Sequence, residues 1–259
     1  MTTALLQLSG VHTHIGSYHI LHGVDFEVPA GQVTMLLGHN GAGKTTTLRT
    51  IMGLWAASQG SIVFDGRHIG GPVSGDARAN DGAGRRTTPE IAQQGIAYVP
   101  ESMGIFSDLT VSENMLLAAR GARTLDHLDS ARLEWLFGLF PALKKFWLHP
   151  AGKLSGGQKQ MLAIARAMVE PRRLLLIDEP SKGLAPAIVQ NLISALRELK
   201  RTDTTVLLVE QNFEVAKALG DHVAVMDDGR VVHRGPMDQL AGDADLQHRL
   251  LGLSLASHS

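Results

Sequence analysis

Eight consecutive residues in the first fifth of the chain follow the pattern G-x-x-x-x-G-K-[ST]. They are Gly38, His39, Asn40, Gly41, Ala42, Gly43, Lys44 and Thr45, and Thr46 follows directly. Glycines in such a loop let the backbone curl until its N–H groups point at one set of phosphate oxygens. The Lys44 ammonium can then reach the terminal phosphates of ATP, and the Thr45 hydroxyl can ligate Mg²⁺. The pattern predicts a nucleotide-binding phosphate loop.

An acidic pair, Asp178 and Glu179, ends the apolar run Leu174-Leu175-Leu176-Ile177. Ligands of α/β sheets bind at the carboxyl ends of strands, where a phosphate loop also lies. Neighbouring residues of an extended chain point in different directions, so the two acids can have different roles. We expect Asp178 to bind Mg²⁺ through water and Glu179 to orient and deprotonate the attacking water. An acidic pair alone often only ends a strand; the phosphate loop favours the catalytic interpretation.

A second anion-binding end is predicted at Ser155, Gly156, Gly157 and Gln158, which open a helix with Met161, Leu162 and Ile164 on its apolar positions. Free N–H groups and the helix dipole attract anions to such an end. A plain N-cap is the alternative. One chain that binds one nucleotide with one loop has no evident need for a second phosphate-binding end.

Alternating strands and helices must position these residues. Val33 to Leu37 reads as a buried strand and Thr45 to Met52 as a helix, so the phosphate loop joins a strand to a helix. The first sixty residues are rich in strand patterns, and the segment from about 107 to 169 is mainly helical. Further predicted elements are strands 96–99, 174–177 and 205–209, a helix 186–200, and a hairpin of 223–226 with 230–233. This order favours a largely parallel sheet.

Composition excludes several classes of protein. The 259 residues carry a formal net charge of −1, which disfavours a nucleic-acid partner. Because there are no cysteines, disulfides and thiolate metal sites are excluded. We find neither an apolar run long enough to span a membrane nor a secretion signal at Met1 to Ala4. His12, His14, His19 and His22 are expected to be surface or strand residues without a metal, and the Gly- and Arg-rich segment 70–88 to be a mobile surface loop.

The phosphate loop, L-S-G-G-Q at 154–158 and L-L-L-I-D-E-P at 174–180 together resemble the ATP-binding cassette (ABC) ATPases. This resemblance covers residues 5–240 and implies an α/β fold: a P-loop NTPase core of mainly parallel sheet, an N-terminal antiparallel β subdomain and an inserted α-helical subdomain at about 107–169. Residues 241–259 would be a C-terminal tail. In that family two cassettes pair head to tail. The resemblance therefore assigns Ser155, Gly156 and Gly157 to the γ-phosphate of a partner's ATP, and the 181–185 loop to communication across the pair.

Longer matches, among them Y-V-P-E at 98–101 and E-P-S-K-G-L-A-P at 179–186, are similar to the second ATPase subunit of branched-chain amino acid importers. Three positions depart from the broad ABC pattern. Ile15 stands where most cassettes stack an aromatic ring on adenine, so that His14 or Tyr18 would have to replace it. Glu101 stands where Gln is usual, next to the metal site, and Gln211 replaces a His that contacts the γ-phosphate. An amide cannot carry a proton, so we hypothesise that this ATP site hydrolyses slowly.

The resemblance thus implies a peripheral ATPase on the cytoplasmic face of the inner membrane. Its partners would be transmembrane permease subunits, a second and unlike ABC ATPase and, indirectly, an external solute-binding protein, with no nucleic acid. An importer of urea or short amides is the alternative solute class. A soluble, non-transport ABC protein and a small-molecule kinase are disfavoured, because the 134 residues from Lys44 to Asp178 leave no room for a long coiled coil and a kinase would not need L-S-G-G-Q.

Overall fold

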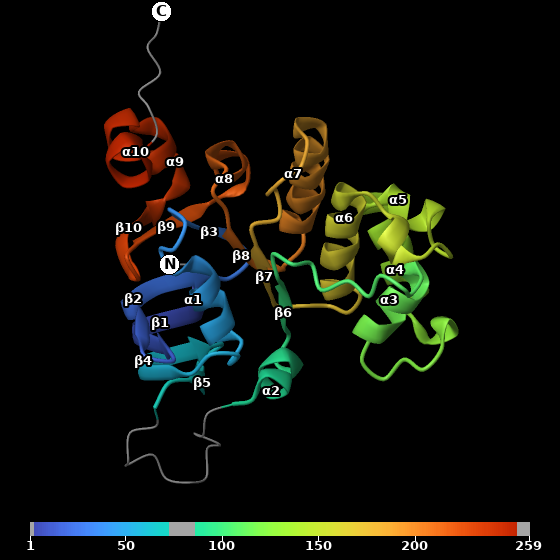
Figure 1. Ribbon diagram of the computed structural model, residues 1–259, viewed down its shortest axis with the longest axis horizontal. Helices are drawn as coiled ribbons and strands as arrows, with labels where there is room; N and C mark the ends of the chain where they lie inside the picture. The colour runs from blue at the N-terminus through green and yellow to red at the C-terminus, as the bar shows by residue number, and fades with distance from the viewer. Residues whose placement is uncertain (1–2, 73–85, 253–259) are drawn as a thin grey trace, which may run out of the picture.

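Two β-sheets of different type frame the molecule (Figure 1), whose computed structural model describes residues 3–72 and 86–252. The larger sheet has the strand order β10-β9-β3-β8-β7-β6, and all its neighbours are parallel except β9 and β10. Its strands are β3 (Val33–Gly38), β6 (Ile96–Val99), β7 (Leu174–Asp178), β8 (Thr205–Val209), β9 (His222–Asp227) and β10 (Arg230–Pro236). Helices cover one face of this sheet, and a helix and the smaller sheet cover the other. For this reason β3, β7 and β8 are buried at every position, and their sequences are nearly continuous apolar runs.

The smaller sheet is antiparallel, with the order β2-β1-β4-β5. It contains β1 (Ala4–Ile15), β2 (Tyr18–Pro29), β4 (Ala57–Phe64) and β5 (Arg67–Gly70). A turn at Asp65-Gly66 joins β4 to β5, with φ of 51° and 72° at its two residues. These positive values are those of the two-residue turn whose twist matches a hairpin.

The helices fall into three groups along the chain: those before β6, the helical region between β6 and β7, and those after β7. The helix α1 (Lys44–Ile51) lies between the two sheets, and α2 (Thr88–Gln93) precedes β6. A helical region follows β6 and is seen at one end of the molecule in Figure 1: α3 (Val111–Ala118), η1 (Leu125–His127), α4 (Ser130–Leu139), α5 (Pro141–Lys145), η2 (Ala151–Lys153) and α6 (Gly156–Ala167). The remaining helices are α7 (Pro186–Lys200), α8 (Phe213–Leu219), α9 (Met237–Gly242) and α10 (Ala244–Leu251).

Each face of the larger sheet has its own hydrophobic core. On one face Val99, Leu175 and Ile177 pack with residues of α3, α6 and α7. On the other face Leu174 and Leu176 pack with α1 and the antiparallel sheet. Since side chains of a strand alternate between faces, one strand such as β7 supplies both cores. The phosphate-loop helix α1 and the helix α6 therefore lie on opposite faces of the sheet.

Most elements expected from the sequence are present, and the differences have local causes. Within the predicted helical segment, Pro141 follows the end of α4 and opens α5, because proline fits the first turn of a helix. Of the expected loop 70–88, residues 73–85 lie outside the described residues, while Gly70 ends β5 and Thr88 begins α2. The segment 241–259 holds the whole of α10, and its last seven residues lie outside the described part of the chain. The helices α2, α8 and α9 and the strand β5 were not predicted.

No helix within the described residues has both the length and the apolar character that crossing a bilayer requires.

Candidate nucleotide site

The loop between β3 and α1 has the backbone that a phosphate cradle requires. Gly38 has φ of 142° and Gly43 has φ of 99°, conformations that side chains rarely permit. A Cβ on Gly38 would lie 2.2 Å from the carbonyl oxygen of Met226, and one on Gly43 would lie 2.9 Å from Leu21 Cδ2. Both glycines are thus required by backbone conformation and by close packing. The loop ends in the free N–H groups at the N-terminus of α1, where an anion is stabilised.

Lys44 lies inside this loop, and only 4% of the residue is exposed. Its Nζ donates to the carbonyl oxygens of Gly38 at 2.8 Å and His39 at 2.9 Å, and lies 3.8 Å from Glu179 Oε1. Burial lowers the pKa of Lys44, while the nearby carboxylates of Glu179 and Asp178 oppose that shift. The ammonium is therefore held where an anionic ligand would compensate its burial.

Asp178, fully buried at the end of β7, accepts two hydrogen bonds from side chains. Thr45 Oγ1 donates to its Oδ1 at 3.0 Å, and the Tyr98 hydroxyl donates to its Oδ2 at 3.2 Å. Burial raises the pKa of Asp178, and these two hydrogen bonds counteract the shift. Hydroxyl and carboxylate oxygens that meet at this edge of the sheet are the hard donors that Mg²⁺ prefers, so the residues present fit that ion.

Glu179, the next residue, faces a different set of groups. Its φ of 47° is unusual for a residue with a side chain, and such strain is concentrated at functional sites. Gln211 Nε2 donates to its Oε1 at 2.6 Å, and Lys182 Nζ lies 3.3 Å from its Oε2. The adjacent carboxylates therefore have separate surroundings, as the sequence predicted.

Gln211 connects Glu179 to the phosphate loop. Its Nε2 also donates to Asn40 Oδ1 at 2.7 Å. A cavity of about 170 Å³ lies beside these residues and is lined by His39, Asn40, Gln211 and, from α10, Leu251. The last described helix thus reaches the edge of the site.

Glu101, the third residue that the sequence assigns to the metal site, contacts Lys182. It is half-exposed, and its Oε1 accepts a hydrogen bond of 2.6 Å from Lys182 Nζ. It still affects the metal site, because its negative charge adds to the raised pKa of Asp178. Lys182 therefore links Glu101 to Glu179.

The predicted second anion site has the local structure expected for it. Ser155 caps α6: its Oγ accepts from Gln158 N at 3.3 Å, and Gln158 Oε1 accepts from Ser155 N at 2.9 Å. A Cβ on Gly156 would meet no atom within 4 Å, whereas one on Gly157 would lie 2.5 Å from Ile188 Cγ2 on α7. Because α6 and α1 cover opposite faces of the sheet, these residues do not join the phosphate loop of the same chain.

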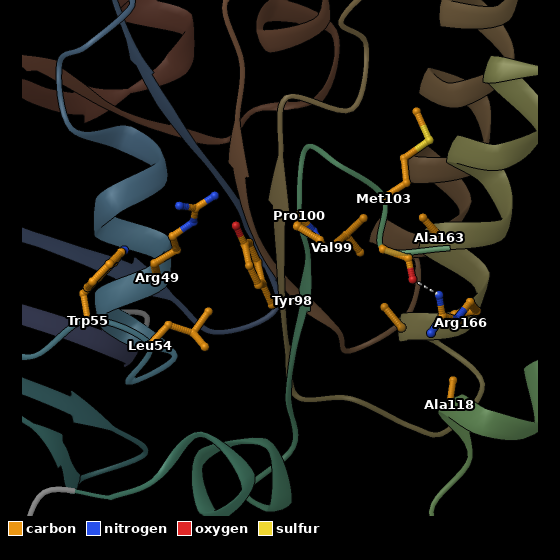
Figure 2. A pocket seen from close by; sticks show the side chains of 12 residues that line it. Arg49, Leu54, Trp55, Tyr98, Val99, Pro100, Met103, Ala118, Ala163 and Arg166 are labelled. Atoms are coloured by element: carbon orange, nitrogen blue, oxygen red, sulfur yellow. Dashed lines mark hydrogen bonds between the residues drawn. The ribbon is translucent and has the colours of Figure 1, made fainter. Parts of the chain in front are cut away.

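A larger cavity, of about 700 Å³, lies away from the phosphate loop (Figure 2). Figure 2 shows Arg49, Leu54, Trp55 and Tyr98 on one wall and Met103, Ala163 and Arg166 on the other. We call it the inter-lobe groove, because its walls come from α1 and the segment after it, from β6, and from the helical region. The complete lining is Arg49, Leu54, Trp55, Tyr98, Val99, Pro100, Met103, Gly104, Ala118, Ala163, Arg166 and Ala167.

The N-terminal histidines gather on one face of the β1–β2 hairpin. His14 and His19 stack with ring centroids 4.1 Å apart, and His12 Nδ1 lies 3.0 Å from His19 Nε2. Within the described residues no cluster of His, Asp and Glu has the arrangement of a metal site. All four histidines lie on β1 or β2, and the pair His14 and His19 adjoins the exposed Tyr18 at the tip of the hairpin.

Sequence reasoning missed three residues of this region: Tyr98, Lys182 and Glu210. The buried Glu210 accepts from Ser181 N at 3.0 Å and from Ser181 Oγ at 2.8 Å, and so ties the 181–185 loop to the Gln211 segment. Tyr98 and Lys182 are part of the two quoted motifs, Y-V-P-E and E-P-S-K-G-L-A-P. The only sequence signal was therefore their presence in those motifs, which does not reveal their contacts.

The relatives of this chain among known proteins are ATP-binding proteins of transport systems. The sequence profile described as "ABC transporter" matches residues 21–182. The high-affinity branched-chain amino acid transport ATP-binding protein BraG of Pseudomonas aeruginosa is 40% identical over 88% of this chain and 91% of its own length. The probable branched-chain amino acid transport ATP-binding protein LivF of Archaeoglobus fulgidus is 31% identical over 91% of this chain and 93% of its own.

Solved structures agree on the fold. A nucleotide-free ATP-binding cassette from an ABC transporter superposes with a TM-score of 0.76 at 24% identity, covering 98% of this chain and 100% of that one. A structure of the ATP-binding subunit of an ABC transporter gives 0.73 at 29% identity, with 96% and 95% covered. The arrangement of strands, phosphate loop and helical region described above is therefore that of a known cassette.

Proposed function

This chain belongs to the ABC transporter family, and from that premise we propose that it is the ATP-hydrolysing subunit of an importer of branched-chain amino acids. One observation carries the catalytic part of the proposal. The phosphate loop, Asp178, Glu179 and Gln211 converge at one edge of the larger sheet, with Glu179 hydrogen-bonded through Gln211 to Asn40. The solute is proposed from the name of the 40% identical relative.

ATP would bind with its β- and γ-phosphates in the loop Gly38–Thr45, including the first turn of α1 with Thr46. Backbone N–H groups there would donate to phosphate oxygens, and the Lys44 ammonium would turn from the carbonyls of Gly38 and His39 to the terminal phosphates. Thr45 and Asp178 would hold Mg²⁺, with Glu101 nearby. The ion, when bound, supplies positive charge that stabilises the phosphate oxygens.

Glu179 would accept a proton from the attacking water. The water oxygen forms a bond to the γ-phosphorus as the bond from that phosphorus to the bridging β–γ oxygen breaks, which releases ADP and phosphate. Gln211 would hold the Glu179 carboxylate in position with its amide, and Lys44 would stabilise the charge on the transferred group. Because Gln211 donates hydrogen bonds without exchanging a proton, it orients groups and does not act as acid or base.

A second ATPase subunit would complete the site. Ser155, Gly156, Gly157 and Gln158 lie at the N-terminus of a 12-residue helix on the face of the sheet opposite α1. They would therefore contact the γ-phosphate held by the partner subunit rather than that of their own chain. An unlike partner is favoured by the likeness to the second of two ATPases. The ATPase unit would span residues 5–240.

The inter-lobe groove is the surface that we assign to the transmembrane permease subunits. Leu54 and Phe106, at or beside its walls, are each 50% exposed, and an unpartnered apolar surface of this kind favours a protein interface. The chain would lie on the cytoplasmic face of the membrane, and the external solute-binding protein would act on it only through the permease. No nucleic acid has a role in this proposal.

Glu179→Gln tests the assignment, because it keeps the shape of the side chain and removes the base. We expect ATP hydrolysis to fall by about 10²- to 10⁴-fold while ATP still binds, and light scattering with Mg-ATP to detect any closed pair that accumulates. Glu134→Gln, at an exposed glutamate of α4, is the matched control and should hydrolyse ATP normally. Unchanged hydrolysis in Glu179→Gln would contradict the mechanism.

The solute needs a separate measurement. Cells that lack this chain should lose uptake of radiolabelled leucine, isoleucine and valine and regain it when the gene is restored. Loss of urea or acetamide uptake with normal leucine uptake would replace the branched-chain assignment by the alternative solute class.

A further inference from the structure

Glu210 directly follows β8, just as Glu179 directly follows β7. The two strands pair in parallel, with Asp178 opposite Val209, so the segments that leave them lie side by side. Glu210 is only 2% exposed, and its carboxylate accepts two hydrogen bonds from Ser181, from the backbone N–H at 3.0 Å and from the hydroxyl at 2.8 Å. It therefore holds the segment that begins two residues after Glu179.

The same carboxylate also holds the segment that carries Gln211. Its Oε2 accepts from the backbone N–H groups of Gln211 and Asn212, each at 3.3 Å, where α8 begins. Gln211 in turn donates from its side-chain amide to Glu179 Oε1 at 2.6 Å. One buried side chain thus contacts the backbone on both sides of the hydrogen bond between Gln211 and Glu179.

The surroundings of Glu210 suit a carboxylate better than a neutral side chain of the same shape. Its four contacts all come from N–H or O–H donors, and within the described part of the chain no cationic side chain forms an ion pair with it. Burial raises the pKa of Glu210, and the hydrogen bonds from Ser181, Asn212 and Gln211 counteract that shift. A carboxylate that is buried without a cation costs free energy, and such a cost is typical of functional sites rather than of packing.

We propose that Glu210 is a positioning residue for ATP hydrolysis, which fixes the Gln211 amide against the Glu179 carboxylate. The proposal rests on the function proposed above, because it concerns the same reaction. Glu210 acts through the main chain, since it holds the N–H of Gln211 on one side and that of Ser181 on the other. A shift of about 1 Å in a positioned group can lower a rate by about 10²-fold, so this contact should affect kcat far more than ATP binding.

Glu210→Gln tests this role, because it keeps the size of the side chain, removes the charge and turns an NH₂ group toward N–H donors. We expect kcat for ATP hydrolysis to fall by about 10- to 100-fold, while the KM for ATP and the affinity for a fluorescent ATP analogue stay within about twofold of wild type. Glu214→Gln, at an exposed glutamate of α8, is the matched control and should keep the wild-type kcat. An unchanged kcat in Glu210→Gln would overturn the proposal.

A double substitution separates positioning from a general structural effect. A residue that acts through Gln211 loses its effect when the Gln211 amide is absent. In a Gln211→Ala background, Glu210→Gln should therefore change kcat by less than about twofold, the range within which independent effects add. A loss of kcat as large as in the wild-type background would overturn the proposal, because Glu210 would then act by another route.

These measurements distinguish the proposal from the one on which it rests. A wild-type chain that neither binds the ATP analogue nor hydrolyses ATP would overturn the proposed function and this role with it. Normal wild-type hydrolysis without a loss in Glu210→Gln would overturn only the role of Glu210. Thermal melting of each variant shows whether the fold is kept.

Ser181→Ala keeps the proposal testable if Glu210→Gln does not fold, because it removes only the hydroxyl that donates to Glu210. It should lower kcat by about threefold or more at an unchanged KM for ATP, since the carboxylate is then less firmly held. A folded Ser181→Ala chain with the wild-type kcat would overturn the proposal.

Discussion

At the scale of single residues, the site is organised by groups that bridge its parts. Gln211 joins the phosphate loop to Glu179, and Lys182 joins Glu179 to Glu101. Neither bridging residue is itself a carboxylate or part of the phosphate loop. The position of the Glu179 carboxylate is therefore set from two sides, by the Gln211 amide and by the Lys182 ammonium. The effect of each can be tested separately.

Gln211→His is predicted to accelerate hydrolysis. An imidazole can donate to the γ-phosphate and also exchange a proton, which the amide cannot do. We expect kcat to rise by at least about tenfold, below the ~10²–10⁴ that positioned proton transfer can supply. Single-turnover ATP hydrolysis checks this, with Gln247→His on α10 as control. An unchanged rate would contradict the hypothesis that Gln211 makes this site slow.

Lys182→Met removes a cation from between two carboxylates. Hydrogen bonds to Glu101 and then to Glu179 raise the pKa of Lys182, so the side chain stays charged. Without it Glu179 loses the ion pair at 3.3 Å on its Oε2, and ATP hydrolysis should slow by up to about 10²-fold because the carboxylate is less well positioned. Lys182→Arg should restore the wild-type rate. Equal rates for all three proteins would show that Lys182 does not act on Glu179.

At the scale of elements, the contact between α6 and α7 fixes the predicted second anion site in place. Gly157 lies against Ile188, while the neighbouring Gly156 is open to solvent. The two glycines of one motif thus have different physical roles. Gly157 permits helix packing, and Gly156 faces open space.

Gly157→Ala is predicted to destabilise the fold by about 1–3 kcal/mol, because the new Cβ would overpack against Ile188. Gly156→Ala is the matched control. It should leave the free energy of unfolding unchanged or raise it slightly, by up to about 1 kcal/mol, because alanine is the better helix former. Urea unfolding measures both. Equal effects of the two substitutions would contradict the packing argument.

The β1–β2 hairpin should be sensitive to acid. Burial, followed by the charges of His19, His22, Arg230 and His14, lowers the pKa of His12 from 6.5. The unfolded chain therefore binds a proton before the folded chain does, and stability falls as pH drops through 6.5 toward the lower folded-state pKa. Urea unfolding at pH 7.5 and 5.5 should show a smaller loss for His12→Gln than for wild type. His248→Gln, on the exposed face of α10, should lose as much as wild type.

At the scale of the whole molecule, one sheet separates two phosphate-binding ends. The loop and α1 lie with the antiparallel sheet, and α6 lies with the helical region. The two ends lie on opposite faces of one sheet and do not meet within one chain, so under the proposed function a second chain would complete the ATP site. Under the proposed function, the groove between the same two halves is the surface that a permease subunit would contact.

Mg-ATP is predicted to stabilise the whole chain. A ligand present at 100 times its dissociation constant stabilises the folded state by about 2.7 kcal/mol, and a thermal melt of the Glu179→Gln chain would show this as a higher Tm. Adding Lys44→Ala to that chain should abolish the increase, whereas adding Lys217→Ala, at a half-exposed lysine of α8, should not. An increase that survives the loss of Lys44 would place the nucleotide elsewhere.

Structural features that depend only on residues close together in the sequence could be predicted from it. The buried strands β7 and β8 were found because a sheet covered on both faces needs continuous apolar runs. The capping box Thr110–Glu113, which opens α3, is another such local feature, with Glu113 N donating to Thr110 Oγ1 at 3.2 Å. The phosphate loop was recognised because its conformation depends on glycines at fixed spacing.

The sequence by itself therefore determined the family resemblance, most strands and the residue types of the site. Only the tertiary structure decided which of these residues meet. Tyr98 and Asp178 are 80 residues apart, and Gln211 and Asn40 are 171 apart. It also decided that α6 and α1 lie on opposite faces. The physical reason is that local patterns specify turns, caps and periodicity, whereas a contact between distant side chains exists only after the sheet has fixed its strand order and register.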